Sequence, residues 1–238
     1  EISTDPHGVL PTGYVSTTTT PNEWGFSVQE GLGCSSTRAL RMWDGSSTWE
    51  AAIKKVVSSS NKKTLEFRCR IASLPISPDI TQLNIPILGT VSGVEAKVFW
   101  VAVFASTSTI GIVKYHNGTA WTQIGTATLP INSSTWKLIK IAANESANTA
   151  SLYIDGVLMG SFPMSAPSAS ATTLTGFGFN SNGTSTSGES VVFDDVNFYD
   201  PTVSGGSGVA SVASQDMLTP AFGDISAVTD QLASGDFS

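Results

Sequence analysis

Three aromatic side chains stand in or beside strand-like stretches of the chain, two of them around one turn. Tyr115 and Trp121 flank the Asn-Gly pair of YHNGTAW, and Trp100 lies in the apolar run 98–105. An exposed aromatic ring offers a flat apolar face on which a pyranose ring can stack when polar groups lie nearby. We therefore predict Tyr115, Trp121 and Trp100 as candidate carbohydrate-binding residues. The alternative is a place in the core. We expect it for Trp100 and Trp136, and for Trp121 both interpretations stay open.

The two cysteines, Cys34 and Cys69, are the next residues that could do chemistry. Their separation is far from that of a zinc knuckle, so they do not predict a metal site. A disulfide between them would stabilise the fold by roughly 3–4 kcal/mol through the unfolded chain. The alternative is a pair of buried thiols, because Cys69 lies on the apolar face of LEFRCRI and cysteine is often buried. We carry the Cys34–Cys69 disulfide as a candidate and leave both alternatives open.

Common catalytic motifs are missing from the sequence. It contains no Gly-x-Ser-x-Gly, no His-Glu-x-x-His and no glycine motif that would cradle a phosphate. The only histidines are His7 and His116, and His116 falls in a predicted turn, where we expect a solvated side chain rather than a base. The densest acidic group is Glu189, Asp194 and Asp195. We therefore predict no enzyme from these residues.

Charge excludes two classes of partner. The 238 residues carry a formal net charge of −7, and only 13% of them are charged. No basic run exceeds the pairs Lys54-Lys55 and Lys62-Lys63, which disfavours nucleic acid and anionic membrane surfaces. No apolar run is long enough to span a membrane. The chain begins at Glu1 without a Met, from which we expect a processed, exported or assembled protein.

Alternating patterns and tight turns predict antiparallel strands. In TLEFRCRI at 64–71, apolar and charged residues alternate, which indicates one buried and one wet face. The run 95–106 is apolar on both faces and predicts a central strand. Asn-Gly within 109–129 and Asp155-Gly156 within 136–162 predict two hairpins.

Two segments are harder to assign. Residues 47–57 fit a helix or a strand, and we prefer the strand because a strong strand follows. Three prolines predict a loop over 72–86, followed by a short strand at 87–91.

A change of composition after Pro201 marks a boundary. SGGSG at 204–208 reads as a flexible linker, and the tail that follows is small and polar. We predict one β-sandwich over 1–203 and a linker and tail over 204–238. Such a tail could dock on a neighbouring copy by adding a strand to a sheet edge, so a homo-oligomer is one candidate partner arrangement.

Several motifs, in order, carry a resemblance to a known group. The chain resembles the concanavalin A-like lectin/glucanase superfamily over residues 8–200, and most of all its laminin G-like and bacterial carbohydrate-binding jelly-roll modules. The motifs are LPTGY, RALRMWDG, TLEFRCRI, YHNGTAW, STWKLIKIAA, ASLYIDGVLMGSF and VVFDDVNFYD. The resemblance implies an all-β, antiparallel β-sandwich of the jelly-roll type.

The same resemblance tests two catalytic patterns. Family 16 glycoside hydrolases of this fold carry a Glu-x-Asp-x-(x)-Glu strand, which places paired carboxylates on one face, and this chain has no such run. Alginate lyases of this fold use an Arg/Glu/Arg strand with Gln-x-His. Glu66, Arg68 and Arg70 resemble the strand, but Gln-x-His is missing. We expect these three residues to form a solvated face with cross-strand ion pairs.

A structural calcium is also implied. Related jelly-roll modules often hold one near the closing Asp-Asp strand, which corresponds to Asp194 and Asp195 here. Calcium takes six to eight oxygens, so backbone carbonyls and another carboxylate, such as Asp5 or Asp44, would be needed. The alternative is that Asp194 accepts hydrogen bonds at the end of a strand.

Together these observations predict a non-catalytic module for glycan binding or adhesion. We expect it outside the cell, on the surface of a cell, filament or virion, with a glycan or neighbouring surface subunits as partners. One alternative is a polysaccharide-active enzyme, a glycoside hydrolase or lyase, or its accessory domain. Another is a structural coat subunit without a ligand. Four glycosylation sequons, at Asn117, Asn132, Asn144 and Asn182, matter only in a eukaryotic secretory protein.

Overall fold

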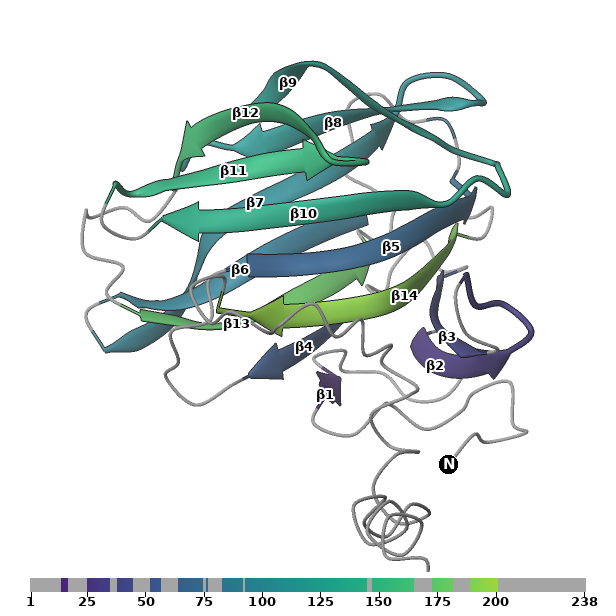
Figure 1. Cartoon of the computed structure of the whole chain (residues 1–238), viewed down its shortest axis with the longest axis horizontal. Coiled ribbons are helices and arrows are strands. Elements are labelled where there is room, and N and C mark those ends of the chain that lie inside the picture. Colours follow the sequence, from purple (N-terminus) through teal and green to yellow (C-terminus); the bar gives the residue numbers. More distant parts are fainter. Residues whose placement is uncertain are drawn as a thin grey trace, which may run out of the picture.

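A computed structural model describes the parts of the chain that form the two sheets and most of their connections (Figure 1). The described residues are 14–16, 25–34, 38–44, 52–56, 64–74, 76, 83–91, 93–144, 147–164, 173–181 and 189–200. The predicted linker and tail at 204–238, His7 and the sequon at Asn182 lie outside them. No helix in the described part of the chain is long and apolar enough to cross a membrane.

Seven strands form one sheet, called sheet A. Each pair of neighbours in it is antiparallel. In spatial order the strands are β1 (Tyr14–Ser16), β4 (Ala52–Val56), β13 (Thr173–Ser181), β6 (Leu83–Val91), β7 (Val94–Ala105), β8 (Ile110–His116) and β9 (Trp121–Pro130).

The other seven strands form sheet B, which is also antiparallel throughout. Figure 1 shows the two sheets stacked face to face. In spatial order the strands of sheet B are β12 (Val157–Pro163), β11 (Thr149–Ile154), β10 (Lys137–Asn144), β5 (Thr64–Ser73), β14 (Glu189–Tyr199), β3 (Arg38–Asp44) and β2 (Gly25–Glu30). The predicted all-β antiparallel sandwich is confirmed.

Phenylalanine rings join the two sheets at the centre of the core. Phe179 of sheet A lies with its ring centroid 4.1 Å from that of Phe193 and 5.2 Å from that of Phe67, both in sheet B. All three side chains are buried. The predicted inward residues of β5, Leu65, Phe67, Cys69 and Ile71, are buried in the same cluster. Burial of one face of each sheet therefore follows the period-two pattern of the sequence.

Two segments show how pairing decides what local pattern leaves open. Residues 47–57, which fit a helix or a strand by sequence, contain β4. This strand pairs with β1 and β13, so the predicted strand is confirmed. The predicted loop over 72–86 is wrong at its end, because β6 begins at Leu83 and includes Pro86. Proline normally avoids inner strands because it has no N–H to donate. Here the pairing of the rest of β6 with β13 and β7 holds it in place.

The Asp155-Gly156 turn has the backbone that its sequence predicts. Both residues have positive φ, 50° and 80°, as a two-residue hairpin turn of the primed type requires. The Asp155 carboxylate also accepts the Leu138 N–H at 3.0 Å and pairs with Lys137 Nζ at 2.6 Å. The turn between β11 and β12 is thereby fastened to the start of β10.

Candidate functional site

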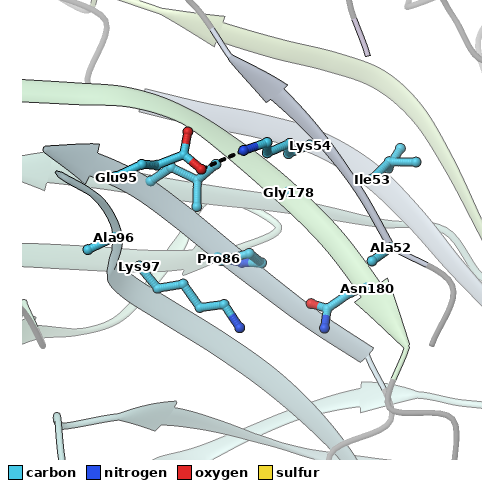
Figure 2. Close-up of a pocket in the computed structure, with 10 residues that line it drawn as sticks. Ala52, Ile53, Lys54, Pro86, Glu95, Ala96, Lys97, Gly178 and Asn180 are labelled. Carbon is cyan, nitrogen blue, oxygen red and sulfur yellow. Dashed lines mark hydrogen bonds and ion pairs between the residues drawn. The ribbon is translucent and has the colours of Figure 1, made fainter. Parts of the chain in front are cut away.

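A cavity of about 310 Å³ opens on the outer face of sheet A (Figure 2). Four adjacent strands, β4, β13, β6 and β7, supply its lining, and the side chains that face it are mostly small or apolar. The lining residues are Ala52, Ile53, Lys54, Pro86, Leu88, Glu95, Ala96, Lys97, Gly178 and Asn180.

Gly178 keeps the floor of this cavity open. In β13 the glycines alternate with Phe177 and Phe179, whose side chains are buried between the sheets. Strand alternation therefore places Gly178 on the outer face. A Cβ at this position would lie 2.9 Å from the Ile53 carbonyl oxygen and 3.2 Å from Pro86 Cγ. The GFGF pattern is the signal by which the sequence could have revealed a hollow here.

Polar groups stand at the margins of the cavity. Lys54 and Glu95 form an ion pair at 2.6 Å across one side, which Figure 2 shows as a dashed line. Asn180 donates from Nδ2 to the Ser181 carbonyl at 3.4 Å, while its buried Oδ1 accepts no hydrogen bond. In Figure 2, the Lys97 side chain extends toward Asn180. The cavity is thus lined by the Lys54–Glu95 ion pair and by two further polar residues, Asn180 and Lys97.

A row of rings leads away from the cavity across three strands. Pro86 of β6 lies opposite Trp100 of β7. On the other side of Trp100, His116 of β8 stacks at 4.2 Å between ring centroids and 18° between planes. His116 lies opposite Trp121 of β9, whose ring meets it edge to face at 5.1 Å. Phe104 lies beneath Trp121 at 5.5 Å and is buried outside the main core.

His116 is held as a neutral ring in this row. The Gly118 N–H donates to its Nδ1 at 3.1 Å, so its own proton belongs on Nε2. Partial burial, and then the positive charge of Lys97, lower the pKa of His116 below 6.5. The expectation of a solvated turn residue is wrong, because His116 ends β8 and is half-buried against Trp100. The ring therefore offers Nε2–H as a donor at neutral pH.

The structure divides the predicted aromatic set. Trp100 and Trp121 lie together, with ring centroids 5.9 Å apart, and both are half-buried on the outer face. Tyr115 is separated from them and does not line the site. Its ring packs on the core and stacks on Phe162 at 4.5 Å, because alternation turns positions 115 and 116 to opposite faces of β8. The expected core position of Trp100 is also wrong.

The same correction applies to Trp136. We expected it in the core, but it is half-buried, with the guanidinium of Arg70 5.5 Å from the centroid of its ring. Arg70 belongs to the outer face of sheet B, so Trp136 and Trp100 lie on opposite faces of the sandwich.

The predicted metal pair is used within the protein. Asp194 and Asp195 are both buried. Asp194 accepts the Cys34 N–H at 2.7 Å and the Asp195 N–H at 2.9 Å, and Asp195 pairs with Arg68 at 3.2 Å. These contacts match the alternative of a hydrogen-bond acceptor. Calcium needs six to eight oxygens, and the described residues contain no group of three His, Cys, Asp or Glu side chains that could hold a metal.

Of the two further carboxylates proposed for calcium, Asp44 lies far from Asp194 along the sheet, and Asp5 is not tested. Asp44 lies opposite Glu189 in the β3–β14 pairing. That is five residues from Asp194, or roughly 16 Å along a strand. Asp5 lies outside the described residues. The calcium site stays a prediction that would need ligands from beyond the described part of the chain.

Both cysteines are free thiols, so the candidate disulfide is not formed. Cys69 is buried between the sheets and lies opposite Phe193. Cys34 is exposed, in a segment whose backbone binds Asp194 on the outer face of sheet B. The two side chains therefore lie on opposite faces of the sheet. Burial raises the pKa of the Cys69 thiol to about 12, with a smaller contribution from Asp155.

The Glu66, Arg68 and Arg70 face resembles a lyase strand only in residue type. Arg68 forms the cross-strand ion pair with Asp195, as expected. Glu66 accepts a hydrogen bond from the Tyr199 hydroxyl at 3.4 Å. These residues lie on sheet B, away from the cavity on the outer face of sheet A. Their arrangement accounts for them as a stabilising surface.

Comparison with solved structures places the sandwich among known folds. A structure named as a sialidase matches with a TM-score of 0.60 at 11% identity, over 80% of this chain and 17% of that chain. This chain thus spans a small part of that protein. A structure described under "Prominent members of the human gut microbiota express endo-acting O-glycanases to initiate mucin breakdown" matches with a TM-score of 0.50 at 13% identity. That match covers 79% of this chain and 92% of the other.

These likenesses show that the two-sheet antiparallel sandwich is a fold shared with those structures, and the predicted resemblance is confirmed at the level of the fold. No protein-family model matches the sequence, and a comparison with curated proteins finds no match either.

Proposed function

We propose that this chain is a non-catalytic glycan-binding module that binds through the outer face of sheet A. The observation that carries the proposal is the continuous row from the glycine-floored cavity through Pro86 to Trp100, His116 and Trp121. A hollow bordered by flat rings and a few polar groups is the usual form of a site for a small polar ligand with apolar faces.

We place the sugar ring beside Trp100, on the side away from His116. His116 stacks on one face of Trp100, and Pro86 lies opposite Trp100 in the β6–β7 pairing. The Lys97 ammonium lies 5.4 Å from the centroid of the same ring. A pyranose lying over Gly178 and Pro86 would stack on the face of Trp100 away from His116. Asn180 Oδ1 accepts no hydrogen bond but is buried, so a hydroxyl would reach it only after the Asn180 side chain turned toward the cavity. An unsatisfied buried acceptor costs about 1–3 kcal/mol, so its satisfaction favours binding.

The lining of the cavity supports binding without catalysis. Among the described residues that line it, Glu95 is the only carboxylate, and it is paired with Lys54. Hydrolysis of a glycosidic bond generally needs two carboxyl groups, about 5–9.5 Å apart, on either side of the bond. We accordingly place the protein with adhesive or binding modules on an exterior surface rather than with polysaccharide-active enzymes.

Substitution of matched tryptophans tests the site. Trp100→Ala should raise the Kd for the best ligand on a glycan array by about tenfold or more, because it removes the stacking face. Trp121→Ala should weaken binding less, since Trp121 supports the row from its far end. Trp136→Ala, on the opposite face, should leave Kd unchanged. Thermal melting of each variant checks that it is folded.

Three outcomes would contradict the proposal. An array on which no glycan binds the wild-type protein would remove glycan binding altogether. Equal losses in Trp100→Ala and Trp136→Ala would remove the assignment to sheet A. Release of shorter saccharides from any bound polymer, measured by reducing-end assay, would overturn the non-catalytic part.

A further inference from the structure

Positive charge gathers on the face that carries the cavity. Lys54, Lys97 and Lys114 come from three strands of this face, and Glu95 is the one carboxylate among the described residues of the cavity lining. The whole chain has a net charge of −7, so this patch opposes the general charge of the protein. A local field of one sign selects ligands of the other sign.

The three lysines differ in what they already contact. Lys54 is paired with Glu95 at 2.6 Å. Lys114 lies with Nζ 3.9 Å from the centroid of the Phe104 ring. The Lys97 ammonium lies 5.4 Å from the centroid of the Trp100 ring and near enough to His116 to lower its pKa, and it forms no ion pair with a carboxylate of the described residues. Lys97 is therefore the cation on this face that is best placed to pair with a ligand.

The position of Lys97 agrees with a ligand in the cavity. It lines the cavity with Asn180, and Figure 2 shows the two side chains reaching toward each other below Pro86. A sugar stacked on the cavity side of Trp100 would bring its substituents between the Lys97 ammonium and the Asn180 amide. The ammonium can pair with an acidic group of the sugar.

We propose that the site takes an acidic glycan, whose carboxylate or sulfate group pairs with Lys97 while its ring lies against Trp100 and Pro86. This inference rests on the proposed glycan-binding function and specifies the class of ligand. A lysine recognises negative charge as a point charge, so the shared chemistry is the anion rather than one particular acid.

The test compares a polymer with its own uncharged form. Isothermal titration calorimetry or affinity electrophoresis measures the binding of the full chain to polygalacturonate and to carboxyl-reduced polygalacturonate. Dextran sulfate and dextran provide the sulfate arm. The wild-type protein should bind at least one acidic polymer about tenfold tighter than its neutral counterpart, as expected for one charge-assisted contact. The preference should shrink as NaCl is raised, because salt screens exposed charges.

Two variants locate the effect. Lys97→Gln should abolish the preference, so that the acidic polymer and its uncharged form bind the variant with the same Kd. Lys140→Gln, on the outer face of sheet B, should keep the wild-type preference. Preference for polygalacturonate alone identifies a carboxylate, and preference for dextran sulfate alone identifies a sulfate.

The failures of the two proposals are distinguishable. If the neutral polymers, or neutral glycans of an array, bind as tightly as the acidic ones, the acidic-glycan inference is wrong and the glycan-binding function stands. If Lys140→Gln loses the preference as fully as Lys97→Gln does, general electrostatics explains it and the inference is wrong. If no acidic or neutral glycan binds, the proposed function itself fails, and the inference with it.

Discussion

The outer faces of the two sheets differ in the contacts of their polar side chains and in shape. On sheet B, Arg68 pairs with Asp195, Glu66 accepts from Tyr199, and the Lys140 ammonium lies 5.5 Å from the Tyr153 ring, while Arg70 Nε and Thr64 Oγ1 are buried without a hydrogen-bond partner. On sheet A, Gly178 has no side chain and Pro86 only a small ring, so a cavity forms over them. Asn180 Oδ1 is buried there without a hydrogen-bond partner.

The contrast teaches where a ligand can gain free energy. Unsatisfied buried polar groups occur on both sheets, so they do not distinguish the two faces, whereas the cavity and the row of rings belong to sheet A. Both faces carry lysines and aromatic residues, so composition does not distinguish them. The arrangement of those residues does, and each of the following changes should affect one face and spare the other.

The largest effect is expected at Asp194, beneath the outer face of sheet B. Asp194→Ala removes the acceptor of two backbone N–H groups, from Cys34 and Asp195. Because the groups are buried, we expect a loss of about 3 kcal/mol in the free energy of unfolding, measured by urea denaturation. Asp194→Asn, which keeps one acceptor oxygen, should lose less. Glycan affinity of the folded variant should not change, and a large fall in it would break the separation of the two faces.

A smaller loss of stability, but a loss of binding, is expected at Gly178. Gly178→Ala places a methyl 2.9 Å from the Ile53 carbonyl oxygen and fills the floor of the cavity. The strain should cost about 1–2 kcal/mol, and the lost volume should weaken glycan binding. Ala142→Val adds bulk to the outer face of sheet B as a control and should leave binding intact. Unchanged affinity in Gly178→Ala would show that the ligand lies elsewhere.

Acid should weaken the sheet B side through Asp155. Burial raises the pKa of this carboxyl, but the hydrogen bonds from Lys137 and Leu138 outweigh it, so the net shift is downward. The ionised form is thus favoured by folding. Its contribution is complete above the unfolded pKa of about 3.9 and is lost as pH falls through the folded value. Asp155 is largely exposed, so we expect less than about 1 kcal/mol.

Asp155→Asn isolates this contribution. The variant should be slightly less stable than the wild type at pH 7, with a shallower fall in melting temperature below pH 4. Parallel acid limbs for the two proteins would contradict the role given to this carboxylate.

The smallest effect is expected at His116 on sheet A. Its pKa is lowered by burial and by Lys97, so the unfolded chain binds a proton more readily than the folded one. The stability due to the neutral ring is present above about pH 6.5 and is lost as pH falls toward the folded pKa. NMR titration should place His116 below 6.5, and Lys97→Gln should raise it. A value at or above 6.5 would contradict the packing of this row.

Much of the fold could be predicted because its signals are local. The inward residues Leu65, Phe67 and Cys69 follow from alternation, and the Asp155-Gly156 turn follows from the φ that glycine accepts. Trp100 and Trp121 could be selected by residue type. Their joint position could not be predicted, because it depends on the register that β7, β8 and β9 adopt.

Errors arose where a local signal met a tertiary constraint. Pro86 predicted a loop, but pairing on both sides makes it part of a strand. Tyr115 and Trp121 flank one turn, which groups them in the sequence, yet neighbouring positions on a strand face opposite ways, so Tyr115 turns to the core. The residues near His116 in the sequence predict a turn, because nothing among them shows that Trp100 covers the ring.

The sequence by itself determined that the protein is an antiparallel β-sandwich and which side chains of an alternating strand such as β5 face its interior. Period-two patterning and turn residues act within a few positions, and the chain displays them directly. Only the tertiary structure decided which strands are neighbours and in what register, because those pairings are long-range. Gly178, Pro86 and Trp100 lie far apart in the chain, and pairing of β13, β6 and β7 makes one surface of them.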